Sequence, residues 1–497
     1  MGRFHRLASL WVALASLLIS VALAILTPLP APQFHDEFSY LLAGDTFAHG
    51  RLTSPSHALW EFFETFQVIQ QPTYMSKYPP GQGLVLALGL VLTGEPVVGI
   101  WISTALACAA LWWALAGFVP RRWATIGAVI ATTHPLMLKW NWSYWGGALA
   151  VIGAALFVGG AVRFSKRPVP AGIAMGVGGF ILLITRPFEG ALLVMLTVLL
   201  MRAPSPRPFH PPLRGDHGRR GGKTAALLAM VAALVGGVVW IGYYNWRVTG
   251  SAVRLPYVVY ESIYAVNPPF LWMRGTHEDR GFRHDAMRRY YLEWELPQYR
   301  EQRHQPIAKK LWDFAREYFY SVALILPALL ALRDPLGRRA LVVASMFTLI
   351  TFGNLWFFPH YAAPAVPVYL LIVILGLRQL RALPGGRWLV RGVLAFHLVA
   401  CVVWIARMDR ARTGWNYRRA DLIQQIREQN RKVLVIVRPS PDSYTHNEFV
   451  YNDPDIDASP VVWARDMGGE RNERLIAYFR GREVWLLREG EGMEPYR

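Results

Sequence analysis

The sequence predicts a polytopic α-helical membrane protein of about eleven transmembrane helices, with interfacial helices in its outer loops and a small C-terminal α/β domain. Three observations support this fold class. Of the 497 residues, 53% are hydrophobic and only 17% are charged, which leaves too little polar surface for a soluble chain of this length. The apolar residues form runs of about 15–22 residues, close to the length that crosses a bilayer. The basic residues cluster between these runs.

The apolar runs define the predicted spans. We place these spans at 7–27, 97–118, 123–138, 144–162, 169–185, 189–202, 223–245, 318–333, 338–358, 361–378 and 387–405. The run 81–94 is only about fourteen residues long, and an apolar run of that length is more often interfacial than spanning. We therefore expect it on the outer side of the membrane. We interpret the first span as a retained helix, because its apolar stretch of about twenty residues is longer than the core of a signal peptide.

The net charge of +19 is explained by the connections between the spans. The strongly basic connections alternate along the chain, so all of them can face the cytoplasm together, as the positive-inside rule requires. They are "MGRFHR", "PRRW", "RFSKRP", "RAPSPRPFHPPLRGDHGRRGGK", "RDPLGRR" and "LRQLRALPGGRWLVR". This distribution favours membrane topology over nucleic-acid binding as the origin of the charge, and we expect no nucleic-acid partner. The N-terminus is predicted inside and the C-terminus outside.

The chain is predicted to divide into a transmembrane domain, 1–406, and an extracytoplasmic α/β domain, 407–497. Two connections of the first domain are long: outer loop one, 28–96, and the outer loop 246–317. The loop 246–317 is rich in Tyr, Trp, Arg and Glu, and its amphipathic spacing predicts interfacial helices that cap an outer site.

The C-terminal domain shows the periodicity of a small α/β fold. "KVLVIVR" (432–438) and "EVWLLRE" (483–489) predict buried strands, and "RADLIQQIREQN" and "ERLIAYFRG" predict helices. No glycine-rich phosphate loop follows either predicted strand, so we expect no nucleotide site.

With this orientation, the chemically unusual segments gather on the outer face. Asp36 and Glu37 stand side by side directly after the first span. A carboxylate at the membrane surface can act as a general base or bind a metal ion, whereas a solvated loop start explains the pair equally well. His35 could complete a metal site with the two acids, so a divalent metal ion with Asp36, Glu37 and His35 as ligands is kept as a hypothesis.

The segment "KYPPGQG" combines a cation with a rigid turn. Pro79 and Pro80 fix the backbone and disfavour a helix at Tyr78. Lys77 would then lie near the interface, where a point charge suits a lipid phosphate. The alternative is a lysine that extends to the interface beside a helix start. We take Lys77 and Tyr78 as candidate substrate-binding residues.

The segment "KWNWSYWGG" concentrates aromatic side chains on the same face. Such a cluster is typical of the aromatic belt of membrane proteins. Carbohydrate rings also stack on Trp, so Trp142, Tyr144 and Trp145 are candidate substrate-binding residues under the second interpretation.

Two further pairs lie at predicted outer helix ends. Arg186 and Glu189 in "TRPFEG" could form an internal ion pair, or Arg186 could contact a phosphate. His360 and Tyr361 in "FFPHYAAP" occupy a similar position, where a lone His is more often structural. We keep all four as candidate substrate-binding residues.

The first outer segments resemble a known family. "DE", then "SYLLAGDTFAHGRLTSP", then "KYPPGQG" opening an apolar segment, is similar to the first outer loop of the GT-C superfamily glycosyltransferases. That superfamily includes the bacterial aminoarabinose and galacturonic acid transferases of lipopolysaccharide and the protein O-mannosyltransferases. The resemblance covers roughly residues 7–200, and the multi-helix layout extends to about 405.

The resemblance implies a function and residue roles. It implies a hexosyl or pentosyl transferase of a bacterial inner membrane that moves a sugar from a polyprenyl phosphate, with inversion, on the outer face. It assigns the role of base or metal-linked acid to Asp36, with Glu37 beside it, and the lipid-phosphate region to Lys77. The extra Tyr78 between the lysine and the prolines departs from the family pattern. The acceptor, a lipid, glycan or protein, stays open, and membrane lipids are expected partners.

Two other functions compete with this interpretation. A polysaccharide ligase or polymerase uses similar donors with different motifs. A flippase or transporter would place charges near the bilayer midplane and often shows repeated halves. The charges here cluster at the outer rim and no repeat is visible, which argues against transport.

Overall fold

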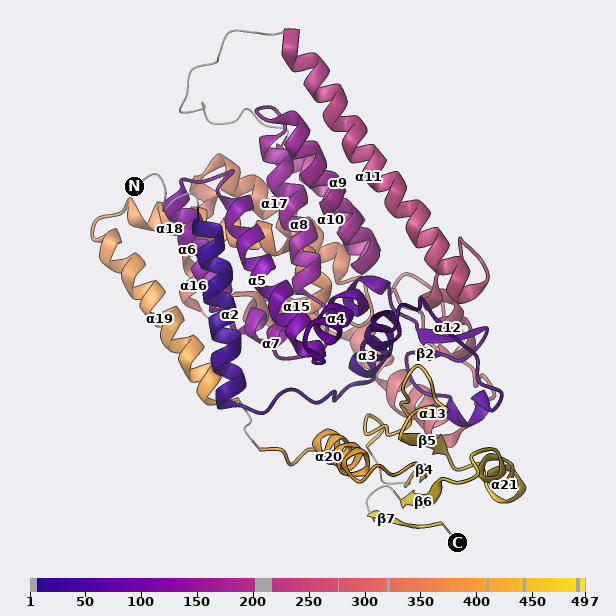
Figure 1. Cartoon of the computed structure of the whole chain (residues 1–497). Helices are drawn as coiled ribbons and strands as arrows, with labels where there is room; N and C mark the ends of the chain where they lie inside the picture. Colours follow the sequence, from indigo (N-terminus) through magenta and orange to yellow (C-terminus); the bar gives the residue numbers. More distant parts are fainter. Residues whose placement is uncertain are drawn as a thin grey trace.

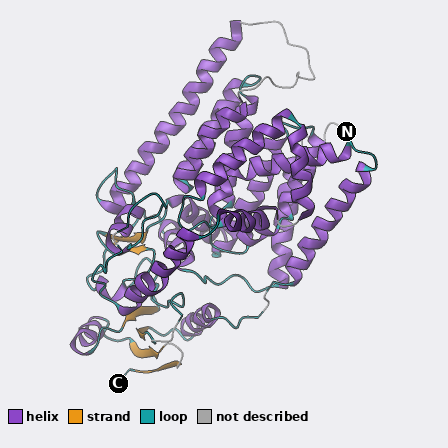
Figure 2. Cartoon of the chain, turned by 180° about the vertical axis from the view of Figure 1, so that it is seen from behind, coloured by secondary structure: helices purple, strands orange, loops and turns teal. Residues whose placement is uncertain are grey.

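The computed structural model describes residues 7–201, 217–275, 277–319, 322–408, 411–440, 444–488 and 492–496. It shows a helical bundle with small β-sheets at one end (Figure 1). Figure 2 shows the same arrangement from behind, with the strands confined to the end that carries the C-terminus. The start of the long helix α11 lies at the opposite end of the molecule (Figure 1).

Each of the eleven predicted spans contains a helix. These helices are α2 (Ala8–Leu26), α5 (Pro96–Leu115), α6 (Arg121–Thr132), α8 (Ala148–Arg163), α9 (Pro168–Thr185), α10 (Pro187–Met201), α11 (His217–Thr249), α16 (Val322–Leu329) continued by η3 (Leu330–Arg333), α17 (Pro335–Thr351), α18 (Val366–Arg381) and α19 (Gly386–Ala406).

Fewer than eleven of the described helices meet the length and composition expected of a membrane-spanning helix. Among the described residues, six helices are long and apolar enough to cross a membrane, or up to seven if one bent pair counts as a span. The helix α6 has 12 residues and α8 has 16. At 1.5 Å per residue these helices are about 18 and 24 Å long, shorter than the roughly 30 Å hydrocarbon core. The count of eleven therefore stays a prediction.

The short apolar segment 81–94 forms α4 (Pro80–Thr93), which lies across the bundle. In Figure 1, α4 and α3 (His35–Ala48) are seen nearly end-on, whereas α5 runs along the bundle. Close packing fixes this crossing, because a Cβ added to Gly99 of α5 would lie 1.9 Å from the Val85 carbonyl oxygen of α4. This arrangement agrees with the prediction that the segment does not span the membrane.

The loop 246–317 contains the helices that its amphipathic spacing predicts. They are α12 (Pro256–Tyr264), α13 (Asp285–Arg288), the π-helix η2 (Arg289–Glu295), α14 (Leu296–His304) and α15 (Ile307–Phe319). A short helix, α7 (Pro135–Asn141), and a 3₁₀ segment, η4 (Pro359–Ala365), complete the outer end of the bundle.

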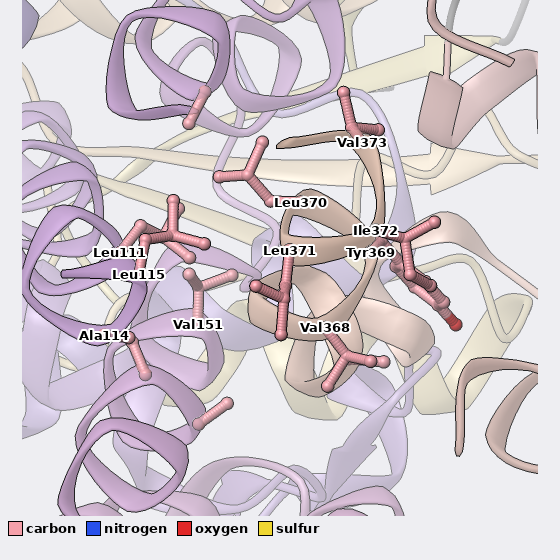
Figure 3. Packing of buried hydrophobic residues seen from close by; sticks show 14 of the residues in the cluster. Leu111, Ala114, Leu115, Val151, Val368, Tyr369, Leu370, Leu371, Ile372 and Val373 are labelled. Atoms are coloured by element: carbon pink, nitrogen blue, oxygen red, sulfur yellow. The ribbon is translucent and has the colours of Figure 1, made fainter. Parts of the chain in front are cut away.

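The main core of the bundle surrounds α18. Buried apolar side chains of α18 such as Val368 and Leu371 pack close to Leu111 and Leu115 of α5 and Val151 of α8 (Figure 3). A helix that is apolar on all sides must be enclosed by other helices. This packing gives the loops at the outer end a rigid support.

The first outer loop forms a small antiparallel sheet around a 3₁₀ turn. Its strands are β1 (Ser54–Pro55), β2 (Val68–Ile69) and β3 (Thr73–Ser76), in the order β1-β3-β2, and the turn is η1 (Trp60–Phe63). The hydroxyl of Ser39 on α3 donates to the carbonyl of Gln67 at 2.6 Å and contacts the hydroxyl of Ser76 at 2.7 Å. These bonds fix the end of β3, and therefore Lys77, against α3.

The C-terminal segment has strands and helices where the sequence predicts them. It contains α20 (Trp415–Glu428), β4 (Val433–Arg438), β5 (Val461–Arg465), α21 (Gly469–Tyr478), β6 (Glu483–Arg488) and β7 (Gly492–Pro495). The sheet order is β5-β4-β6-β7, with β4 parallel to both β5 and β6 and β7 antiparallel to β6. The strands β5 and β7 are absent from the prediction.

This sheet shares its core with the first outer loop. Leu434 and Ile436 of β4 lie in one buried cluster with Phe38 of α3 and Phe62 of η1. The alternate residues of β4, such as Val435, pack with side chains of α20 instead. A strand exposes alternate side chains to opposite faces, so α20 covers one face and outer loop one covers the other. The boundary at 406 between two domains stays a prediction.

A buried ion pair anchors the C-terminal segment. Arg465 at the end of β5 contacts Glu448 at 2.7 Å, and the two side chains are only 5% and 4% exposed. The Nε of Arg465 also donates to the carbonyl of Glu64 in the first outer loop at 2.7 Å. The pair therefore links the sheet to the loop that carries Lys77.

We predict that Glu448→Ala destabilises this region by about 3–5 kcal/mol, because it leaves the buried Arg465 without its counter-charge. Urea denaturation of the purified protein, followed by hydrogen exchange of β5, measures the effect. The exposed Glu473→Ala is the control and should change stability by less than about 0.5 kcal/mol. Equal stability of the two variants would contradict the anchoring role.

Candidate active site

Four separate segments bring the predicted residues together at the end of the bundle that is predicted to face outward. The first turn of α3 supplies Asp36, and the link between β3 and α4 supplies Lys77 and Tyr78. The link between α9 and α10 supplies Arg186, and η4 supplies Tyr361. Because these segments are far apart in sequence, only the fold brings the acid close to the cations.

Asp36 lies at the centre of this group. Its carboxylate accepts a hydrogen bond from the Tyr78 hydroxyl, and the charges of Lys77 and Arg186 act on it. Burial raises the pKa of Asp36 above its ordinary value, and these three partners oppose that rise without cancelling it. The side chain nevertheless keeps partial solvent access. A raised pKa and access are the properties of a carboxylate that can take a proton from a substrate.

Lys77 is enclosed by acidic and aromatic side chains. Its Nζ contacts the carboxylate of Glu261 at 2.6 Å, and its own side chain is only 7% exposed. The Nζ also lies 4.7 Å from the ring centroid of Tyr257 and 4.6 Å from that of Tyr260. Burial and the neighbouring charge of Glu261 raise the pKa of Glu295 to about 8, while Lys77 opposes this rise. The ammonium group is therefore ordered before any ligand arrives.

Arg186 is the second cation whose charge acts on Asp36. Its guanidinium stacks over the ring of Tyr361 at 4.7 Å, a cation–π contact. Electrostatic coupling also links Arg186 to Glu189, which is buried on α10. The guanidinium lines a small cavity together with Tyr40 and Gln82. The guanidinium of Arg186 therefore borders this small cavity.

Glu37 is enclosed by backbone amides. Its Oε2 accepts from the N–H groups of Gln33 at 2.8 Å and Phe34 at 3.2 Å, and its Oε1 accepts from the N–H of Tyr144 at 2.9 Å. The bond back to Phe34 satisfies an N–H at the start of α3, as in a capping box. Glu37 therefore ties α3 to the aromatic segment around Tyr144.

The aromatic side chains of the segment 140–145 have two kinds of environment: some pack against other helices and loops, and Trp145 lies near His360. Trp142 stacks on Trp101 with centroids 6.0 Å apart, and the Tyr144 hydroxyl donates to the carbonyl of Pro30 at 2.8 Å. Trp145 lies 5.2 Å from the ring of His360. The Trp145 Nε1 and the His360 Nδ1 are buried and have no hydrogen-bond partner within the described chain. These two nitrogens can therefore serve a ligand.

His35 faces the C-terminal segment instead of the acids. Its Nδ1 contacts the Tyr451 hydroxyl at 2.9 Å, and its ring stacks on that of His446 with centroids 5.1 Å apart. Burial lowers the pKa of His35 well below its ordinary value, so the ring is neutral. This histidine joins α3 to the C-terminal segment.

Comparison with known proteins identifies the fold. No family model and no curated protein sequence matches this chain. Solved structures do: ArnT from Cupriavidus metallidurans in its apo state superposes with a TM-score of 0.52 at 14% identity, over 96% of this chain and 92% of ArnT. The same ArnT bound to undecaprenyl phosphate gives a TM-score of 0.50 at 13% identity, with the same coverage of 96% and 92%.

A third structure comes from an archaeon. The Archaeoglobus fulgidus oligosaccharyltransferase, in complex with Zn and sulfate, gives a TM-score of 0.52 at 12% identity, over 96% of this chain and 67% of that one. The chain has the GT-C fold. The resemblance seen in the first outer loop is thereby confirmed at the level of the fold.

The three candidate metal ligands of α3 lie in different surroundings. Among the described residues, no group of three or more His, Cys, Asp or Glu side chains could hold a metal ion. Metal binding by His35, Asp36 and Glu37 therefore stays a hypothesis. Consecutive helix residues point about 100° apart, and the structure directs the His35 Nδ1 to Tyr451 and the Glu37 oxygens to backbone amides.

Several residues around Lys77 were missed by sequence reasoning. Glu261, Tyr257 and Tyr260 lie on α12, and Glu295 ends η2. The stretch "YVVYESIY" carried a signal, because tyrosines at i, i+3 and i+7 share one face of a helix with Glu261. Its partner Lys77 is 184 residues away in sequence, which no local pattern can reveal.

We predict that Glu37→Gln loosens the start of α3 without unfolding the bundle. The amide keeps only one acceptor oxygen, so a buried N–H loses its partner at a cost of about 1–3 kcal/mol. Hydrogen exchange at Phe34 or Tyr144 should therefore accelerate by roughly tenfold to a hundredfold. The exposed Glu95→Gln is the control, and unchanged exchange at both sites in Glu37→Gln would refute the tie.

Proposed function

We propose that the protein is an integral-membrane glycosyltransferase that moves a sugar from a polyprenyl-phosphate carrier to an acceptor hydroxyl on the extracytoplasmic face of a bacterial inner membrane. One observation carries the proposal: the carboxylate of Asp36, a residue with partial solvent exposure, is close enough to two cations, Lys77 and Arg186, to feel their charges at one end of a bundle with the GT-C fold. A base beside a phosphate-binding pair is what transfer from a sugar phosphate requires.

The two cations fit the phosphate of the donor. Lys77 has three N–H donors and gives one to Glu261, so two remain for phosphate oxygens. Arg186 presents a planar guanidinium that pairs with phosphate through two hydrogen bonds. The undecaprenyl phosphate bound by ArnT, which shares the fold, supports a donor of this class.

A small apolar cavity nearby suits the part of the prenyl chain next to the phosphate. It lies between α6, α7, α15, α16 and α18 and is lined by side chains that include Met137, Phe319 and Val366. Tyr318, which also lines the cavity, donates to the carbonyl of Pro359, directly before His360. The cavity is therefore adjacent to the residues that approach Arg186.

The reaction follows as one displacement. Asp36 accepts the proton of the acceptor hydroxyl while that oxygen forms a bond to the anomeric carbon of the donor sugar. The bond from the anomeric carbon to the phosphate oxygen breaks, and its electron pair leaves with the polyprenyl phosphate. Lys77 and Arg186 stabilise the charge that develops on this leaving group. A single displacement inverts the anomeric carbon.

Aromatic and imidazole groups fit the sugar. Trp145 and Tyr361 offer ring faces for stacking, and the buried Trp145 Nε1 and His360 Nδ1 lack protein partners in the described residues. A sugar hydroxyl can satisfy such atoms, whose burial without a partner is otherwise costly. The outer orientation is supported by the basic connections, which the positive-inside rule assigns to the cytoplasm.

We predict that Asp36→Asn lowers transfer by about 10²–10⁴-fold, because the amide cannot accept the acceptor proton. The assay incubates the purified protein with a panel of polyprenyl-phosphate sugars and membrane extract, and measures the released polyprenyl phosphate. Asp45→Asn, an equivalent change later in α3, is the control and should keep full activity. Equal rates for Asp36→Asn and the wild type would refute the role of base.

We predict that Tyr78→Phe shifts the acid side of the pH–rate profile to higher pH. The Tyr78 hydroxyl stabilises the ionised carboxylate of Asp36, so its removal raises a pKa that burial has already raised. The base must be ionised, and the rate therefore falls earlier as the pH decreases. Lys77 and Arg186, which also lower this pKa, are unchanged. Tyr444→Phe, at an exposed position, is the control; an unshifted profile in Tyr78→Phe would exclude Asp36 as the titrating group.

A further inference from the structure

A second polar cavity lies between the C-terminal sheet and the loop 246–317. Its volume is about 240 Å³. It is lined by Arg283, His284, Asp285, Ala286, Pro439, Arg465, Asp466, Met467 and Arg471. None of these residues belongs to the group around Asp36.

The acids of this cavity are already neutralised by other residues. Asp466 accepts from Arg438 and from Asn472, and Asp285 pairs with Arg288 at 3.2 Å. Neither carboxylate is therefore left to repel an anion strongly.

The cations keep free donors. Arg283 uses its Nε for Glu64 at 2.8 Å, and Arg465 uses its Nε and one terminal nitrogen for Glu64 and Glu448. Each of these guanidiniums has further N–H groups. Arg471 is exposed and, among the described residues, forms no ion pair or hydrogen bond. The cavity therefore offers guanidinium donors from three directions.

The backbone around the cavity also favours an anion. The cavity lies at the carboxyl ends of the parallel strands β4 and β5, where α/β sheets commonly bind ligands. The helix α21 begins beside it, after Gly468, and no side chain caps its first N–H groups. The positive end of the helix dipole adds to the three guanidiniums.

A continuous helical segment joins this cavity to the candidate active site. The helices α13 and η2 run from Asp285 at the cavity to Glu295 beside Glu261 and Lys77. Ten residues at 1.5 Å per residue amount to about 15 Å. A molecule that reaches both places must be extended and must be longer than one sugar ring.

We propose that this cavity binds an oxyanion, a carboxylate or phosphate, carried by the acceptor at a distance from the hydroxyl that receives the sugar. The assignment to the acceptor rests on the proposed function, whereas the anion site itself does not. The donor phosphate is bound elsewhere, by Lys77 and Arg186, so the cavity is free for the acceptor. The enzyme would then select acidic saccharides of at least two residues.

Binding without turnover tests the site. The probes are a disaccharide with one uronic acid, its uncharged methyl ester and inorganic phosphate, titrated into the full-length detergent-purified protein by calorimetry. We expect the acid to bind at least tenfold more tightly than the ester, and Arg471→Glu to lose at least tenfold of that affinity. Arg480→Glu, the same charge change at the end of α21 outside the cavity, should leave it unchanged.

Three results would overturn the proposal. Equal affinity for acid and ester would exclude an anion site, and an unaffected Arg471→Glu would exclude this cavity. Phosphate binding without any saccharide binding would show an adventitious ion only. The variant Asp36→Asn leaves the cavity unchanged, so this variant should bind the acidic disaccharide normally. This result is expected even if no sugar transfer is ever observed. The binding test can therefore fail or succeed independently of the proposed function. In the transfer assay, Arg471→Glu should raise KM for an acidic acceptor at unchanged kcat.

Discussion

The arrangement of the outer end depends on the buried carboxylate of Glu37. Its bonds to the backbone of Gln33, Phe34 and Tyr144 join three stretches of chain: the exit from α2, the start of α3 and the aromatic segment before α8. Charge-assisted bonds to backbone amides are stronger than neutral ones and are well defined in direction. They fix the first turn of α3, and with it the direction in which Asp36 points. Of the two adjacent acids, Glu37 therefore fixes the backbone of the site, and Asp36 keeps partial solvent exposure.

The C-terminal segment supports this turn from the other side. Phe38 of α3 stacks on Tyr451 with centroids 4.2 Å apart, and His35 bonds the same tyrosine. One face of the C-terminal sheet packs against the first outer loop in the buried cluster that also contains Tyr451. The helix α3 is therefore enclosed between the bundle and the sheet, which restricts its motion relative to Lys77. Such rigidity is what a preorganised site requires, since misplacement by about 1 Å can cost a hundredfold in rate.

The sequence predicted the helices of the bundle, the strands β4 and β6, and the candidate residues Asp36, Lys77 and Arg186, because apolar runs, charge placement and local motifs are properties of short segments. It could not separate Asp36 from Glu37, since their roles follow from directions about 100° apart on a helix whose start was unknown. It also grouped His35 with them as a possible metal ligand, whereas the fold directs this ring to Tyr451. The enclosure of Lys77 by α12, and the packing of the sheet on outer loop one, depend on contacts between segments hundreds of residues apart. The number of crossings was uncertain because α6 and α8 are shorter than a bilayer.

The charges around Lys77 explain how a buried cation stays available to a phosphate. Two carboxyls, Glu261 and Glu295, lie near its ammonium group. Burial and the charge of Glu261 raise the pKa of Glu295 to about 8, so Glu295 is mostly protonated at neutral pH. Lys77 then faces one carboxylate instead of two, and Glu295 remains a hydrogen-bonding group that accepts from Asn267 at 3.1 Å. With two ionised acids the local charge would oppose an incoming phosphate. With only one ionised acid, the pair of Lys77 and Glu261 is neutral. Arg186 then supplies the positive charge that attracts the donor phosphate.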